Sequence, residues 1–309
     1  MVFTVTLNPA IDKTVVIPGF QPGKVNRIQS LRADAGGKGI NVSKCLKQLS
    51  VESVAAGIFA GSAGDTLLAM LDEMGISTLS ISVAGQSRTN TKIIDPEQKL
   101  NTDINEPGPQ VPAQSLTLLR DEIGRRITPG DAVVLSGSLP AGAPDTLYRD
   151  WIACFRDLGA KVFLDADGAA LVQGVQASPW LVNPNDAELS RLVGRNLETR
   201  EDLRKAGEAL LKTGIREVVI SLGGEGALFL SEEAKFQAKA LKVPVQSTVG
   251  AGDSMVAAMV CGYVNQLPRE NVIRLAAAMG AASCMCDGSQ APDGALVHRL
   301  AEQVEIAPL

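Results

Sequence analysis

The sequence predicts an α/β protein with a mainly parallel central sheet and helices on both of its faces. Three observations lead to this prediction. Short apolar runs alternate with segments of helical period, the pattern of strand–helix–strand units. The chain has 309 residues, of which 45% are hydrophobic, enough for one large core. Two stretches between Asp12 and Asn105 lack helical period and show short extended pieces around turns, which predicts a small additional β-sheet.

The alternating part of the chain supplies the strands and helices of the body. We expect strands at residues 2–7, 53–58, 132–135, 161–164, 180–182 and 217–221, and helices at residues 40–49, 65–74, 114–126, 145–158, 187–193 and 201–212. After Ser221 the order changes to a β meander at residues 227–230 and 235–243. A glycine-rich turn and two long helices of small residues follow. Strands joined through helices pair in parallel, so we expect parallel pairing before the meander.

The two stretches without helical period each indicate a β-hairpin. The first has extended pieces at residues 13–17 and 25–28, and the second at residues 90–94 and 100–105. Joined as one sheet outside the body, the two hairpins would serve as a lid or a dimer surface. The expected organisation is a body of residues 1–11, 33–87 and 107–309 and a β lid of residues 12–32 and 88–106.

Composition limits the classes of function. A net charge of −5 and a pI near 5.1 leave no basic footprint for nucleic acid or for an anionic membrane. Five scattered cysteines form no metal-binding pattern and are expected to be reduced. The N-terminus lacks a basic region before its apolar run, and the longest apolar stretch, residues 255–264, is too short to cross a bilayer. We therefore expect a cytoplasmic protein.

The stretch QSTVGAGDSMVA at residues 246–257 is the candidate catalytic centre. Gly250, Ala251 and Gly252 lead into Asp253 at the start of a predicted helix, where free N–H groups and the helix dipole favour an anion such as phosphate. A carboxylate beside a phosphate suits the acceptance of a proton from an attacking hydroxyl. The alternative is that Asp253 only caps the helix.

Further polar residues follow other predicted strands, at the edge of a parallel sheet where ligands gather. They are Asp12, the run Gly36-Gly37-Lys38-Gly39-Ile40-Asn41, Ser136 to Pro140, Asn183 to Glu188, and Ser221 to Gly226. Each also has a plain structural explanation as a turn or a helix entry. Asn185 and Glu188 are one helical turn apart, which suits a hydrated Mg²⁺ but equally a capping box.

Two absent nucleotide-binding motifs and the presence of a single histidine limit the possible catalytic chemistry. No GxxxxGK[ST] motif occurs, and no GxGxxG motif follows the first strand, which argues against a P-loop enzyme and a dinucleotide-binding domain. The only histidine, His298, lies near the C-terminus. A carboxylate must therefore act as any general base.

Six motifs in order make the sequence similar to one family. They are TLNPAID at Thr6 to Asp12, AGGKGIN at Ala35 to Asn41, SGSLP at Ser136 to Pro140, NPNDAE at Asn183 to Glu188, SLGGEGA at Ser221 to Ala227 and STVGAGDS at Ser247 to Ser254. Together they span nearly the whole chain and resemble the ribokinase-like (PfkB) carbohydrate kinases, in particular the phosphosugar branch. The resemblance implies a ribokinase-like three-layer αβα fold with a small β-sheet lid.

The resemblance also implies roles for individual residues. Catalytic roles fall to Gly250, Ala251, Gly252 and Asp253, and substrate binding to Asp12, Lys24, Arg27, Gly36, Gly37, Lys38, Asn41, Arg88 and Ser138. Nucleotide binding falls to Asn185, Ser221, Gly223, Gly224, Glu225, Gly226, Thr248 and Gly252. Arg88, helped by Lys24 or Arg27, would pair with the phosphate of the substrate. Glu188 would act on Mg²⁺ through water.

The implied reaction is ATP-dependent phosphorylation of a ketohexose monophosphate, with fructose 1-phosphate as the first expectation. Tagatose 6-phosphate, fructose 6-phosphate and an unphosphorylated sugar stay open as substrates, as does a non-catalytic phosphosugar-binding regulator. ATP and Mg²⁺, a monovalent cation such as K⁺ and a homodimer formed through the lid are also implied. One departure from the branch is Asn183, where a lysine is usual, and this predicts weaker binding of nucleotide phosphate unless Lys38 or another base compensates.

Overall fold

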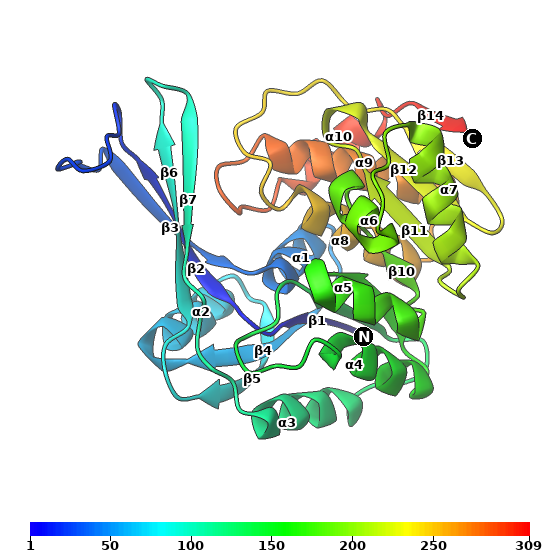
Figure 1. Ribbon diagram of the computed structural model, residues 1–309, viewed down its shortest axis with the longest axis horizontal. Coiled ribbons are helices and arrows are strands. Elements are labelled where there is room, and N and C mark those ends of the chain that lie inside the picture. Colours follow the sequence, from blue (N-terminus) through cyan, green and yellow to red (C-terminus); the bar gives the residue numbers. More distant parts are fainter.

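Ten strands form the central sheet of the computed structural model, which describes all of residues 1–309 (Figure 1). Their order is β14-β13-β12-β11-β10-β9-β8-β1-β4-β5. The strands are β1 Val2–Thr6, β4 Val54–Ala60, β5 Ser77–Val83, β8 Ala132–Ser136, β9 Lys161–Asp165, β10 Leu181–Val182, β11 Glu217–Ser221, β12 Ala227–Ser231, β13 Lys235–Ala238 and β14 Ile306–Pro308. Pairing is parallel from β11 to β5 and antiparallel from β11 to β14, which confirms the predicted mainly parallel sheet.

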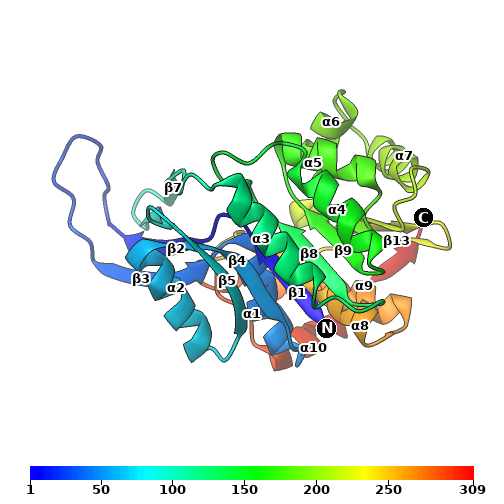
Figure 2. The ribbon, with the colours of Figure 1, turned by 90° about the horizontal axis from the view of Figure 1, so that it is seen from below.

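Helices cover both faces of this sheet (Figure 2). One face carries α3 Ala113–Gly124, α4 Leu147–Asp157, α5 Gly168–Gly174, α6 Asp186–Val193 and α7 Arg200–Leu211, and the other α1 Lys38–Gln48, α2 Gly61–Glu73, α8 Ala251–Val264, α9 Arg269–Cys284 and α10 Gly294–Ala301. Strand β8 shows why the central strands are apolar throughout. Val133 and Leu135 belong to one core, Ala132 and Val134 to the core on the opposite face.

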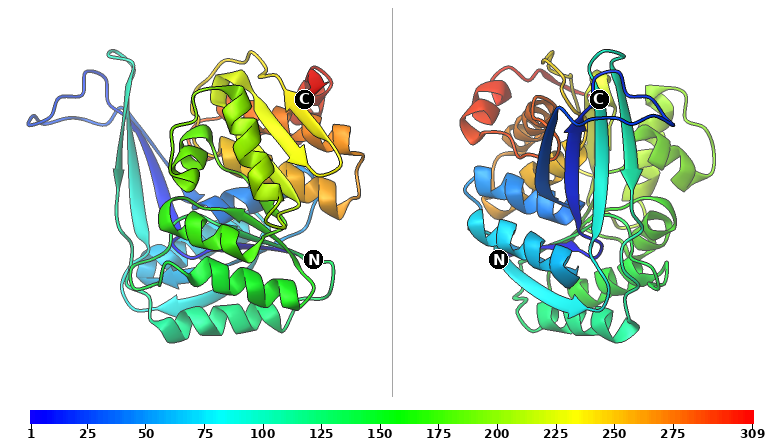
Figure 3. Two further views of the ribbon diagram at one scale, coloured as in Figure 1. Left: turned by 45° about the vertical axis from the view of Figure 1, so that its right-hand side comes forward. Right: turned by 90° about the vertical axis from the view of Figure 1, so that its left-hand side faces the viewer.

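Four strands form a second, smaller sheet in the order β3-β2-β6-β7. They are β2 Ala10–Val16, β3 Ser30–Gly36, β6 Arg88–Asp95 and β7 Leu100–Asn105. The parallel pairing of β2 with β6 joins the two segments that the sequence places far apart, as expected. This small sheet stands beside the body, and the loop of residues 17–29 extends from it away from the rest of the molecule (Figure 3).

Two predicted strand ranges were wrong. Residues 25–28 lie in the loop of residues 17–29 and have no partner strand. Val25 and Ile28 are therefore 83% and 51% exposed. The partner of β2 is instead β3, with Ala10 opposite Gly36. The strand predicted at residues 235–243 is shorter and ends at Ala238. Its outer neighbour β14 pairs with only three of its residues, the last of which is Ala238.

Several short elements had no sequence prediction. Besides β3, they include the edge strands β5 and β14 and the helices α5 and α10. No helix has both the length and the apolar composition needed to span a membrane. All five cysteines are free thiols.

Candidate active site

A cavity of about 880 Å³ lies between the small sheet and the edge of the central sheet where the parallel strands end. Residues of β2, β6 and β7 line it on one side. The first residues of α1 and α8 and the segments that follow β9, β10 and β11 line it on the other. The volume falls in the range of small-molecule sites, and the position is the usual one for ligands of open α/β sheets.

Helix α8 begins at this cavity with an unusual N-terminus. Gly250 precedes the helix at φ +80°, a left-handed conformation that glycine adopts at little cost. No side chain caps the helix, and the N–H groups of Gly252 and Asp253 donate to no protein atom. Free N–H groups at the positive end of a helix dipole suit an anion such as a phosphoryl group.

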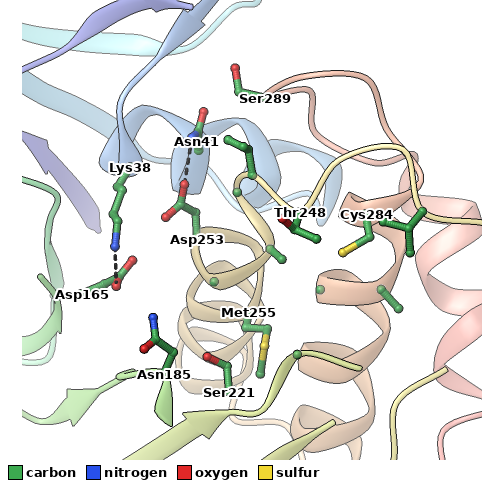
Figure 4. Close-up of a pocket in the computed structure, with 18 of the residues that line it drawn as sticks. Lys38, Asn41, Asp165, Asn185, Ser221, Thr248, Asp253, Met255, Cys284 and Ser289 are labelled. Atoms are coloured by element: carbon green, nitrogen blue, oxygen red, sulfur yellow. Dashed lines mark hydrogen bonds and ion pairs between the residues drawn. The ribbon is translucent and has the colours of Figure 1, made fainter. Parts of the chain in front are cut away.

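The carboxylate of Asp253 is buried beside these N–H groups (Figure 4). Asn41 Nδ2 donates to Asp253 Oδ2 at 2.8 Å and orients the carboxylate. Burial raises the pKa of Asp253 to about 7, and the charge of Asp165 adds to the rise, whereas Lys38 and the Asn41 hydrogen bond lower the pKa. A pKa near neutral suits a general base.

An ion pair lies next to Asp253. The Lys38 ammonium is 3.1 Å from Asp165 Oδ1, while Asp165 Oδ2 is buried without a hydrogen-bond partner (Figure 4). The pKa of Lys38 is raised, chiefly by the charge of Asp165. Sequence reasoning assigned no role to Asp165, although its place directly after the predicted strand at residues 161–164 was an available signal.

The small sheet contributes the polar residues of the opposite wall. Asn90 Nδ2 donates to Asp12 Oδ1 at 3.0 Å, and burial raises the pKa of Asp12. Gly36 does not line the cavity but makes room for Asp12, because a Cβ at Gly36 would stand 2.0 Å from Asp12 Oδ2. Arg88 donates from Nε to the Asn8 carbonyl at 3.1 Å, and burial lowers its pKa. Its two terminal nitrogens have no hydrogen-bond partner in the protein.

The far end of the cavity combines glycines with apolar side chains. Asn185, Ser221, Gly223, Gly224, Gly226 and Thr248 line it together with Val243, Val245, Met255, Ala277 and Cys284. A Cβ added at Gly223 or Gly224 would meet no atom within 4 Å, so the backbone there is open to a ligand. An apolar slot beside exposed backbone suits a nucleotide base.

Asn185 and Glu188 form the capping box that the sequence left as the alternative. The Asn185 side chain accepts the N–H of Glu188 at 2.8 Å, and Glu188 Oε2 accepts the N–H of Asn185 at 2.9 Å. Both residues nevertheless line the cavity, and Glu188 Oε1 makes no hydrogen bond to the protein. No group of three or more His, Cys, Asp or Glu side chains is placed to hold a metal ion directly. The donor set therefore suits a hydrated Mg²⁺ that binds mainly to phosphate oxygens.

Asn183 occupies the position where the resemblance leads one to expect a lysine. Its Nδ2 donates to the Gly252 carbonyl at 3.4 Å, and its buried Oδ1 has no partner. The amide therefore contacts the first residues of α8, next to Asp253, without supplying a positive charge.

Some predicted site residues lie elsewhere. Lys24 and Arg27 are exposed in the loop of residues 17–29, Ser138 is exposed after β8, and Glu225 forms a 2.8 Å ion pair with Arg200; none of the four lines the cavity. The cavity instead includes residues that sequence reasoning did not select, namely Asn90, Lys92, Asp103, Asn105, Asp165 and Ser289. Alternation along the predicted strands at residues 90–94 and 100–105 was the signal for the first four.

Comparisons with known proteins agree with this geometry. Residues 5–295 match the pfkB family carbohydrate kinases. The 1-phosphofructokinase of Vibrio cholerae is 34% identical over 308 residues, covering 100% of this chain and 97% of that protein. The 1-phosphofructokinase of Xanthomonas campestris is 40% identical over 280 residues, covering 89% and 88%. The crystal structure of phosphofructokinase-2 from Escherichia coli in complex with fructose-6-phosphate aligns with a TM-score of 0.92 at 27% identity, covering 98% of both chains. The structure of the same enzyme in complex with potassium gives a TM-score of 0.93 at 28% identity and the same coverage.

Proposed function

Since the chain belongs to the pfkB family of carbohydrate kinases, we propose that it transfers the γ-phosphoryl group of ATP to fructose 1-phosphate, giving fructose 1,6-bisphosphate. The observation that carries the proposal is the buried Asp253 carboxylate beside free helix N–H groups, in one cavity with Asp12 and Asn41. Relatives named 1-phosphofructokinase, at 34% and 40% identity, support the choice of sugar.

Asp253 acts as the general base. The sugar hydroxyl oxygen forms a bond to the γ-phosphorus, the bond from that phosphorus to the β–γ bridging oxygen breaks, and the hydroxyl proton passes to Asp253. The N–H groups of Gly252 and Asp253 donate to the oxygens of the transferring group and stabilise the charge that develops there. Asn41 keeps the carboxylate pointing at the hydroxyl.

Nucleotide and metal bind at the other end of the cavity. Gly223, Gly224 and the apolar slot would hold the nucleotide, and Glu188 would contact the metal through water. A divalent ion, which we assign as Mg²⁺, neutralises charge on the phosphates when it is bound. The potassium complex of the Escherichia coli relative supports a monovalent cation as a further ligand.

At the sugar end, Asp12 accepts hydrogen bonds from sugar hydroxyls and Lys38 donates to them. The side-chain amide of Asn41 can do either. Arg88 pairs with the phosphate already on the substrate, because its two unpartnered terminal nitrogens can bind two phosphate oxygens together.

We assign residues 12–32 and 88–106 as a lid and as the surface of a homodimer in the cytoplasm. Five large apolar side chains on this segment are exposed, namely Val25, Ile28, Leu31, Leu100 and Ile104. A second copy would remove them from water. Lys24 and Arg27 remain predicted substrate ligands, although both are outside the cavity of their own chain.

An assay of ADP release tests the proposal. The purified protein, ATP and Mg²⁺ are incubated with fructose 1-phosphate, fructose 6-phosphate, tagatose 6-phosphate or fructose, and kcat/KM is compared. We expect the highest value for fructose 1-phosphate. A higher value for fructose 6-phosphate, the ligand in the Escherichia coli complex, would reassign the substrate. Binding of a phosphosugar without any ADP release would instead indicate a regulator.

A further inference from the structure

The small sheet presents to the cavity a cation that the reaction described above does not use. Arg88, Asn90 and Lys92 on β6 all line the cavity. Side chains alternate along a strand, so these three residues lie on the same face. The next strand continues that face, because Asn90 lies opposite Asn105 and Lys92 lies opposite Asp103.

Lys92 is largely enclosed and poorly bonded. Its side chain is 16% exposed, it makes no hydrogen bond, and its single ion pair is a 3.8 Å contact to Asp103 Oδ1. An ammonium group has three N–H donors, and withdrawing them from water without partners is costly. A cavity-facing ammonium with unfilled bonding capacity therefore points to an anionic ligand.

Most other cations near the cavity are bonded to the protein. Lys38 pairs with Asp165 at 3.1 Å, Arg88 donates to the Asn8 carbonyl, and Lys44 donates to the Ala35 carbonyl at 2.8 Å. Lys13 also lines the cavity and makes no hydrogen bond or ion pair, but it lies opposite Thr91 and therefore alternates to the other face of the small sheet. Among the small-sheet cations on the face of Asp12 and Asn90, Lys92 has the weakest link to the protein.

The spacing on β6 suits one phosphate held between two cations. Lys92 is four residues beyond Arg88, which corresponds to about 13 Å along an extended strand. Two long side chains that lean toward each other can close that gap around a single phosphate group. The oxygens of a phosphate monoester accept hydrogen bonds from both.

We propose that Lys92 is a specificity-determining residue that binds, together with Arg88, the phosphate group already carried by the sugar substrate. This inference rests on the proposed phosphosugar kinase function. Asp103 holds Lys92 in place when no substrate is bound, and it repels the substrate phosphate when the lysine charge is absent. The Lys92–Asp103 pair thus favours phosphorylated over free sugars.

Steady-state kinetics of Lys92→Met test the role. The substitution keeps most of the length of the side chain and removes its charge. We expect KM for the phosphosugar to rise roughly 10- to 100-fold, the loss typical of one charge-assisted hydrogen bond, with kcat within about twofold of the wild type and KM for ATP unchanged. Lys92→Arg should recover most of the affinity, and Lys92→Met/Asp103→Asn should recover part of it because the repulsion is gone.

Lys99→Met is the matched control, since Lys99 lies in the turn between β6 and β7 and outside the cavity. Equal KM values for Lys92→Met and Lys99→Met would overturn the inference, as would a loss confined to kcat. If Lys92→Met fails to fold, Lys92→Gln provides the same comparison.

The assay separates this inference from the proposed function. It uses the phosphosugar that the wild type phosphorylates best, so failure of fructose 1-phosphate alone removes the proposed substrate and leaves the Lys92 comparison intact. If no sugar is phosphorylated, calorimetric binding of fructose 1-phosphate replaces KM. Weaker binding by Lys92→Met than by Lys99→Met then supports the inference, and equal binding refutes it.

Discussion

In the proposed mechanism, the charge state of Asp253 sets the pH range in which the protein works. Burial raises the pKa of the Asp253 carboxyl well above the usual range of a carboxyl group, and the charge of the neighbouring Asp165 raises it further. Lys38 and Asn41 oppose both effects and bring the pKa to about 7. Near neutral pH the group can therefore both lose its proton before the reaction and accept one during it.

Replacement of Asp253 should separate activity from stability. We expect Asp253→Asn to lower kcat by ~10³-fold or more, because the base is lost. The folded-state pKa lies above the unfolded value of 3.8, so the stability linked to the bound proton is present at low pH and is lost as the pH rises through about 7. The variant should therefore melt at least about 2 °C above the wild type at pH 8, and near the wild type below pH 4. Near-normal turnover, or equal melting temperatures at pH 8, would contradict the assignment.

The acid limb of the pH–rate profile should depend on Asp165. For the wild type, kcat/KM should rise with pH through a midpoint near 7. Asp165→Asn removes a charge that raises the pKa of Asp253, so the midpoint should move to lower pH. Asp167→Asn, at an exposed neighbouring carboxylate, is the control and should leave it unchanged. All proteins are assayed with the same phosphosugar, so titration of the substrate phosphate affects each profile equally. A midpoint that stays the same or rises in Asp165→Asn would exclude this coupling.

At the level of elements, the small sheet depends on contacts between two separate insertions. Strands β2 and β6 pair in parallel, and the buried Asp95 carboxylate accepts N–H groups from Gly19 and Phe20 of one insertion and from Glu97 and Gln98 of the other. Burial raises the pKa of Asp95, but these hydrogen bonds outweigh it and lower the pKa below its usual value. The carboxylate therefore stays charged and links the loop after β2 to the turn between β6 and β7.

The outer face of the small sheet should form the dimer contact. Ile104 is 54% exposed and, by alternation along β7, lies on the face opposite Asp103. We expect the wild type to have the mass of a dimer by light scattering and Ile104→Asp to shift it to a monomer, because a charge replaces apolar contact. Leu118→Asp, at an exposed position on α3, should remain a dimer. A monomeric wild type, or a dimeric Ile104→Asp variant, would remove the proposed interface.

At the scale of the whole molecule, one cavity joins parts of the chain that fold into different layers. The proposed sugar wall belongs to the small sheet, the proposed base to α8, and the proposed nucleotide slot to segments around α8, α9 and the end of β11. Ligands that bridge these parts bind the folded protein only and should therefore stabilise it.

Thermal melting should distinguish the two ends of the cavity. A ligand at 100 times its Kd adds about 2.7 kcal/mol to the free energy of unfolding, which for a chain of this size raises Tm by roughly 4 °C. We expect such shifts for fructose 1-phosphate and for ATP with Mg²⁺. Arg88→Ala should lose the first shift and keep the second, because we assign Arg88 to the sugar phosphate and not to the nucleotide. Equal loss of both shifts would indicate a general structural role for Arg88.

The amino-acid pattern alone was sufficient for the parallel body, the presence of a small second sheet and most of the polar residues at the strand ends. The reason is geometrical, since the carboxyl ends of the parallel strands β10 and β11 meet at one edge and bring Asn183, Asn185 and Ser221 into one cavity. Local turn and helix signals also placed Gly250 before α8.

Other features depend on contacts between residues far apart in the chain. The exposed segment 25–28 and the paired strand β3 have similar local patterns, and only the presence of β2 beside β3 distinguishes them. Asp165 and Asp253 are in different motifs, so the effect of the Asp165 charge on the pKa of Asp253 exists only once both are buried together. The inward position of Lys92 likewise follows from the register between β6 and β7. Burial and register are properties of the assembled chain, because no single segment contains both partners of a long-range contact.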